Sequence, residues 1–258
     1  MLLRRITEHV KAQNWTAVCL DFAIVVIGVG VALVAGEWLN TRAVKADLQR
    51  AEVTIHREVY TNYLNALERM AIQDCNAIQI RQLADKLTNT DEPWVPVEPY
   101  PEAGDIEGAL GGILRAPYRG WPTDAWKTAS DSGLLIYMNP ERRGALSDIL
   151  TISEILSGHE DNIFKKQSEL KALMIASELS ASDRLRYYDI LAEIDAASAL
   201  MEVGAEYVIQ GTESLEIALD PEFEATFLEN VASRNRLGPQ VYGDCFELMV
   251  LPGTEGAP

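Results

Sequence analysis

The chain has few basic residues for its length. Its 258 residues include 22 Lys and Arg against 39 Asp and Glu, for a formal net charge of -17. Residues 1–38 carry three charges of each sign, so the acidic excess belongs to the rest of the chain. An acidic protein repels phosphate backbones, and no basic stripe interleaved with aromatic residues is present. We therefore predict no nucleic-acid partner.

Sequence motifs for catalysis and cofactor binding are also missing. The chain contains no GxGxxG, GxxxxGK[ST], GxSxG or HExxH pattern. Glu52 and His56 have a spacing that can begin a metal site, but no further ligands accompany them, and a surface pair is expected. His159, Glu160 and Asp161 are expected in a solvated turn. We predict a protein that is not an enzyme and needs no cofactor or metal.

A long hydrophobic run occurs near the N-terminus. Residues 22–36 include no charged or strongly polar side chain. Extending this run to Trp15 and Trp38 gives a helix of roughly 35 Å at 1.5 Å per residue, enough to cross about 30 Å of hydrocarbon. Trp15 and Trp38 would then anchor it at opposite interfaces. The pattern favours a retained transmembrane helix over residues 15–38, with a cleaved signal peptide as the alternative.

Small residues recur along one face of this predicted helix. Gly28, Ala32 and Gly36 are spaced by four, which lets another helix approach closely, and Asp21 falls on the same face. This pattern is typical of helix packing within a membrane. The alternative is that glycine is common in membrane helices and that Asp21 lies at the interface without a partner.

Cysteine usage bears on the compartment. Cys75 and Cys245 are the two cysteines outside the predicted transmembrane helix at 15–38. They are expected to form a disulfide in an oxidising compartment and to remain buried thiols in the cytosol. Basic residues flank the run almost equally on both sides, so they decide little about orientation. A short basic N-terminal tail and the cysteine pair favour the bacterial inner membrane with a periplasmic soluble domain.

Helical periodicity dominates the remaining sequence. The predicted fold class is mostly α: an N-terminal amphipathic helix, one transmembrane helix running into a stalk, and a helical bundle-like soluble domain. The predicted organisation is an amphipathic membrane-surface helix at 1–14, the transmembrane helix at 15–38, an acidic helical domain at 39–251 and a loose tail at 252–258.

The element boundaries follow from apolar spacing and from breaker residues. An acidic, proline-rich connection is predicted over 88–104 and an extended strip over 245–251. Trp121 and Trp126 fall in the most aromatic stretch of the soluble part, where they either line a pocket or plug the core. Helices are predicted from the membrane run to about Leu87, over 105–115, from Thr123 to about Tyr137, over 141–179 with a kink at Gly158, over 183–211 and over 222–234.

Two stretches of the chain carry a resemblance. Residues 4–29 contain RR, EH, QNW, TAV, LDF, IVV and GV in this order, and Thr123–Trp126 with Ser132–Leu134 gives T-x-AW followed by SG-L. This pattern resembles a family of uncharacterised bacterial single-pass membrane proteins with a helical domain of unknown function after an N-terminal anchor. The resemblance implies an architecture and no activity.

Two functions from different classes fit these patterns. The first is a non-catalytic accessory or scaffold subunit of a membrane complex, which pairs through its transmembrane helix and helical domain. Its partners would be membrane lipid and either another membrane protein or further copies of the chain. The alternative is a membrane-anchored sensory or small-ligand-binding helical domain.

Overall fold

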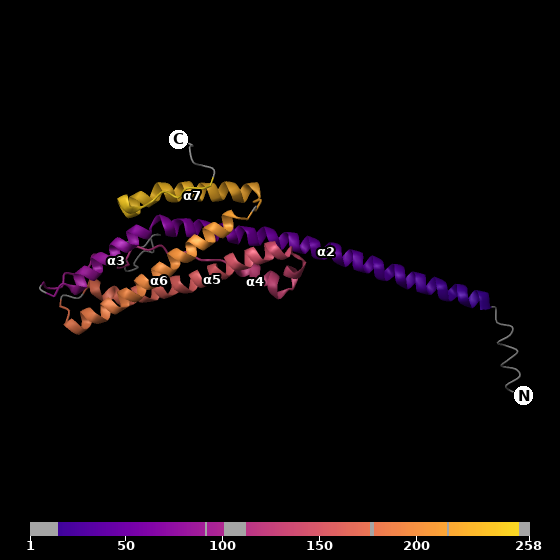
Figure 1. Ribbon diagram of the computed structural model, residues 1–258, viewed down its shortest axis with the longest axis horizontal. Coiled ribbons are helices and arrows are strands. Elements are labelled where there is room, and N and C mark those ends of the chain that lie inside the picture. The colour runs from indigo at the N-terminus through magenta and orange to yellow at the C-terminus, as the bar shows by residue number, and fades with distance from the viewer. Residues whose placement is uncertain (1–14, 91, 101–111, 176–177, 216, 253–258) are drawn as a thin grey trace, which may run out of the picture. The chain divides into compact units, whose positions relative to one another are not determined.

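The computed structural model describes residues 15–90, 92–100, 112–175, 178–215 and 217–252, without the side chains of 15–19 and 21. The predicted helices at 1–14 and, for the most part, 105–115 lie outside these residues, as does most of the tail at 252–258. The described chain is mostly helical and contains no strand (Figure 1). It divides into two units, residues 1–49 and 50–258, which we describe separately.

One helix in the described chain is long and apolar enough to cross a membrane. This helix, α2 (Trp15–Ala71), supplies residues 15–49 to the first unit and residues 50–71 to the second. From Phe22 onward it contains an 18-residue window with a mean hydropathy of 2.2, and no side chain of that window is buried. The predicted apolar N-terminal helix is therefore present.

The chain is helical to Thr88, as predicted to about Leu87, but the helix is broken at Ile72, which was not predicted. α2 ends at Ala71 and α3 (Gln73–Thr88) follows. In an uninterrupted helix the carbonyl of Ala71 would accept from the N–H four residues later. It instead accepts from the N–H of Glu247 at 2.8 Å, so the C-terminal segment takes the bond that would continue the helix.

The two longest helices of the second unit form an antiparallel pair. α5 (Pro140–Glu169) begins with Asn139, whose side chain accepts from the N–H groups of residues 141 and 142, and with Pro140 in the first turn. α6 (Ala181–Glu213) begins with a capping box made by Ser180 and Asp183. α6 packs along α5 and also contacts α3 (Figure 1). Local capping signals thus set where both helices begin.

Two glycines of α6 receive side chains of α5. A Cβ added at Gly204 would lie 2.6 Å from Leu156, and one added at Gly211 would lie 2.8 Å from Ile149. The two glycines are seven residues apart on α6, and the two side chains that fill them are seven residues apart on α5. Both contacts therefore use the same face of each helix, two turns apart. Close packing of this kind fixes the register of the two helices.

The remaining elements differ from prediction at their ends. α4 (Asp124–Asp131) stops because Gly133 adopts a φ of 74°, after which η1 (Leu134–Tyr137) follows; the predicted helix to Tyr137 was wrong. α5 continues through Gly158 and gives way at residue 170 to η2 (Leu170–Met174), so the predicted helix over 141–179 was too long.

α7 (Pro221–Tyr242) runs eight residues beyond the predicted end at 234 and passes through Pro239. The segment after η3 (Gly243–Cys245) supports this extra length. The Asn235 side chain accepts from the N–H of Met249 and donates to its carbonyl, at 2.8 and 2.9 Å. Met249 is itself buried in a cluster with α2 and α7. This contact between distant segments could not be read from local spacing.

Candidate functional site

Gly28, Ala32 and Gly36 lie on the exposed apolar part of α2, and we call them the small-residue face. A Cβ added at Gly28 or Gly36 meets no atom within 4 Å. The large apolar side chains from Leu20 to Val34 are between 52% and 70% exposed. Contiguous apolar surface of this extent is compatible with a membrane anchor.

The predicted flanking residues of this helix are only partly described. Trp38 is exposed, and the guanidinium of Arg42 lies 5.5 Å from the centre of its ring. An exposed tryptophan beside a cation suits a membrane–water interface, where both groups are favoured. Trp15 and Asp21 belong to α2, but their side chains lie outside the described residues.

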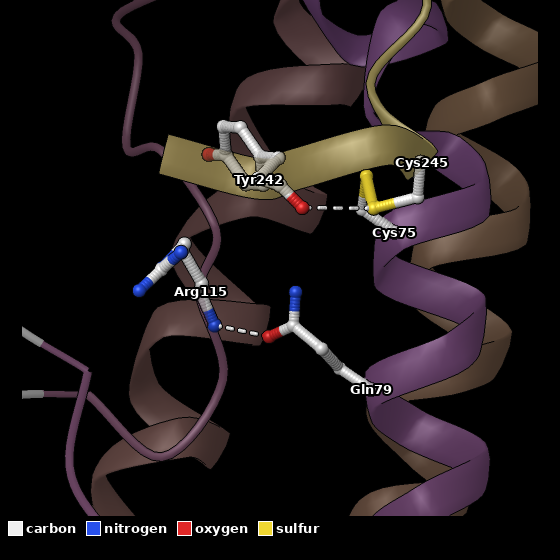
Figure 2. The surroundings of a disulfide bond; sticks show 5 residues. All are labelled: Cys75, Gln79, Arg115, Tyr242 and Cys245. Carbon is white, nitrogen blue, oxygen red and sulfur yellow. Dashed lines mark hydrogen bonds between the residues drawn. A yellow bond between two sulfur atoms is a disulfide. The ribbon is translucent and has the colours of Figure 1, made fainter. Parts of the chain in front are cut away.

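Cys75 and Cys245 form a disulfide with a Cα–Cα distance of 5.2 Å. Cys75 and Gln79 project from α3 at adjacent turns (Figure 2). Gln79 accepts from the backbone N–H of Arg115 at 2.6 Å, while the sulfur of Cys245 lies 3.2 Å from the carbonyl oxygen of Tyr242. One face of α3 therefore holds both the C-terminal segment and the segment after residue 112.

A polar stripe on α2 organises the second unit. Its members are Glu58, Asn62, Asn65 and Glu68, which share one face at spacings of three or four. Asn62 and Asn65 donate to the carbonyl oxygens of residues 122 and 120, at 2.9 and 2.8 Å. Glu58 accepts from the N–H of Ala125 at 2.8 Å, in the first turn of α4. The stripe thus fixes residues 119–126 on α2.

This arrangement separates the two aromatic residues singled out in the sequence. Trp121 is buried, whereas Trp126 is half-buried at the start of α4. A hollow of about 410 Å³ is lined by Trp121 and by Glu154 but not by Trp126. Trp121 is thus buried and also borders the hollow, whereas Trp126 does not border it.

The carboxylate of Glu68 is the centre of a buried charge cluster. Arg119 donates to both of its oxygens, at 2.7 and 2.9 Å, and Arg234 donates to one of them at 2.8 Å. Glu68 is only 6% exposed. Because both oxygens accept from guanidinium groups, this carboxylate is held as a structural anion that joins α2, the 112–122 segment and α7.

Glu160 is the buried carboxyl with a strongly changed acidity. It lies within α5 rather than in a solvated turn, so that prediction was wrong. One of its oxygens accepts from the N–H of Arg119 at 2.9 Å. Burial outweighs this bond and the nearby Arg69 cation, and raises the pKa of Glu160 to about 7.

His56 also differs from its expected exposed pairing with Glu52. It is 9% exposed, and its Nε2 lies 2.9 Å from the Nη2 of Arg142. Burial, followed by the Arg142 cation, lowers the pKa of His56 to about 4. Neutral His56 therefore accepts the hydrogen bond from Arg142 at neutral pH. Among the described residues, no group of three or more His, Cys, Asp and Glu side chains could hold a metal ion.

The polar stripe and the Glu68 cluster were not predicted from the sequence. The prediction for α2 rested on apolar spacing, whereas polar residues that recur every three or four positions also indicate a packed helix face. The spacing of Glu58, Asn62, Asn65 and Glu68 is such a signal.

Scanning of protein-family models, curated proteins and solved structures found no match to this chain.

Proposed function

We propose that the protein is a non-catalytic, membrane-anchored accessory or scaffold subunit of a membrane complex. The observation that carries this proposal is the small-residue face on the exposed apolar part of α2, where an added Cβ at Gly28 or Gly36 meets no atom. Helices associate in lipid largely through close packing at small residues. The partner is another membrane protein or a second copy of the chain.

The proposed architecture is one transmembrane helix that continues as a stalk into a bundle-like domain. The packing of α6 against α5 and α3 supports the bundle. The proposed location of this domain is the periplasm, with the anchor in a bacterial inner membrane. The Cys75–Cys245 disulfide supports this location, because disulfides persist in oxidising compartments. The N-terminal resemblance to uncharacterised single-pass membrane proteins supports the same architecture.

The test is purification of the full chain from native membranes in a mild detergent, with mass spectrometry of what remains bound. We expect a stoichiometric membrane partner, or additional copies of the chain, that is lost on Gly28→Leu. Leucine at this position would keep two helices apart by several ångströms. Gly30→Leu is the matched control, since Gly30 also has open space around it but lies on another face.

Retention of the partner in the Gly28→Leu protein would contradict pairing through this face, as would equal loss in both variants. A monomer in the unchanged protein would remove the accessory role altogether. The location can be tested separately: Cys75 and Cys245 should resist a thiol-reactive reagent in intact cells until a reductant is added. Labelling without reductant would contradict an oxidised periplasmic domain.

A further inference from the structure

A cavity of about 500 Å³ lies within the second unit, and no function proposed above uses it. Tyr60 and Tyr63 of α2, Thr212 and Glu213 of α6, and residues of α7 contribute to its lining. Leu215, residues 217–219 and residues 251–252 complete it. This volume is in the range that holds a small organic ligand.

Three aromatic side chains form one wall of the cavity. The ring centres of Tyr60 and Phe227 are 5.3 Å apart and nearly perpendicular, and those of Tyr63 and Phe227 are 6.0 Å apart and stacked. Leu228 and Leu251 add aliphatic surface. Aromatic faces carry negative electrostatic potential and attract organic cations.

The charged groups at the cavity have one sign. Glu213 and Glu224 line it, and none of the described lining residues is basic. The hydroxyl of Tyr63 donates to Glu213 at 2.8 Å, which positions this carboxylate beside the aromatic wall. Arg57, one turn from Tyr60, is held by Asp220 at 2.9 Å. The cavity therefore favours a positively charged ligand.

A buried polar atom at the cavity has no partner of its own. Thr212 is only 3% exposed, and its hydroxyl oxygen has no hydrogen bond within the described chain. Buried hydroxyl groups are nearly always hydrogen-bonded, so an unpaired hydroxyl on a residue that lines a cavity is consistent with a donor supplied by a ligand. This observation is independent of the carboxylates.

From these features we infer that the cavity between α2, α6 and α7 binds an organic cation, an amine or quaternary ammonium carried on an apolar body. The aromatic and leucine side chains would hold the apolar body, and Glu213 and Glu224 the positive charge. An amine could also donate to Thr212. The inference does not depend on the accessory role, because it involves only residues of the second unit.

The test uses benzyltrimethylammonium as the probe, because its charge does not change with pH. The full chain in micelles of a non-ionic detergent is titrated and followed by the proton NMR signal of the N-methyl groups. We expect a saturable upfield shift, since aromatic faces shield nearby protons. Neopentylbenzene, the neutral isostere, should bind at least about tenfold more weakly if the charge is recognised.

Two double variants separate the cavity from general attraction to an acidic protein. Glu213→Gln with Glu224→Gln should weaken binding by about fivefold or more, since both carboxylates line the cavity. Glu222→Gln with Glu229→Gln removes the same charge from exposed positions of α7 outside the cavity, and should leave binding unchanged. Helicity and thermal melting verify that both proteins are folded.

Equal weakening in the two double variants would overturn the proposal, because it would mean attraction to the overall negative charge. Binding of the neutral isostere as tight as that of the cation would also overturn it, and so would the absence of a saturable upfield shift. None of these results depends on whether a membrane partner exists.

Discussion

The two units of the chain treat apolar and charged side chains in opposite ways. In the first unit, the apolar residues between Leu20 and Val34 are exposed, and nothing lies near Gly28. In the second, Gly204 is filled by Leu156, and even the charged Glu68 and Arg69 are buried and bonded. The same chain thus contains an exposed apolar surface, which is unfavourable in water, and a packed interior from which water is excluded.

This contrast shows what each unit depends on for its stability. Exposed apolar area costs about 25 cal/mol per Å² in water, so the first unit calls for a covering that the described residues do not supply. The second unit is stabilised by its own packing and by hydrogen bonds such as those between Arg119, Arg234 and the buried Glu68 carboxylate. Changes in the second unit should therefore alter folding, whereas changes at Gly28 should alter association.

The largest effect should come from removing the carboxylate that joins α2, the 112–122 segment and α7. Glu68→Ala removes the buried anion that the partly exposed guanidinium groups of Arg119 and Arg234 share, and should cost about 3–4 kcal/mol in the free energy of unfolding. Denaturant unfolding of the full chain in micelles measures this value. Glu154→Ala breaks the exposed pair with Lys127 and should cost less than about 1 kcal/mol. Similar losses in the two variants would show that burial of the Glu68 cluster contributes nothing.

A second prediction concerns pH. Since the pKa of Glu160 rises from its usual 4.5 to about 7 on folding, the folded chain keeps a proton that the unfolded chain releases between these values. Stability should therefore fall as the pH rises from about 4.5 to 7 and then level off, by roughly 3 kcal/mol in total. Glu160→Gln should remove this loss and stabilise the protein at pH 8, with little change at pH 4.

The lowered pKa of His56 acts in the opposite direction and must be measured beside Glu160. Its folded state resists protonation, so its contribution is complete above pH 6.5 and is lost as the pH falls towards 4. The free energy of unfolding is therefore measured against pH for the parent protein, for Glu160→Gln and for His56→Gln. The contribution of each group is the difference between the parent curve and the curve of its variant. An unchanged pH profile in Glu160→Gln would refute the assignment.

The smallest effect should come from glycine. Gly204→Ala forces the Leu156 side chain to move and should destabilise the protein by about 1–2 kcal/mol, because overpacking outweighs the higher helix propensity of alanine. Gly158→Ala, in open space on α5, should stabilise it by up to about 1 kcal/mol. Thermal melting should show a lower melting temperature for Gly204→Ala and a higher one for Gly158→Ala than for the parent protein. Stabilisation by both would mean that α5 and α6 do not pack closely at Gly204.

Local signals explain which parts of the fold could be predicted. The starts of α5, α6 and α7 follow from Asn139, Ser180 and Asp220, which cap them through short-range hydrogen bonds. The apolar run of α2 is visible from hydropathy alone. The break at Ile72 is not, because its cause is a hydrogen bond to Glu247, 175 positions later in the chain.

The candidate sites divide in the same way. The small-residue face was found because its members are spaced along one helix. The cavity was not, since Tyr60, Thr212 and Phe227 come from three helices that only tertiary packing brings together. Glu160 was misjudged because its burial depends on α5 packing and not on its polar neighbours His159 and Asp161. The spacing of residues in the sequence shows which of them share a face of one helix, but not which helices pack against each other.

The Cys75–Cys245 disulfide also has a mechanical consequence. It closes a covalent ring over a sequence separation of 170 residues, which includes α4, α5, α6 and α7. A force that pulls on the two ends of the chain enters the ring at one sulfur and leaves at the other, so the residues between them carry no tension. Under load only the segments outside the ring could extend, and the helices inside would stay folded until the disulfide was reduced.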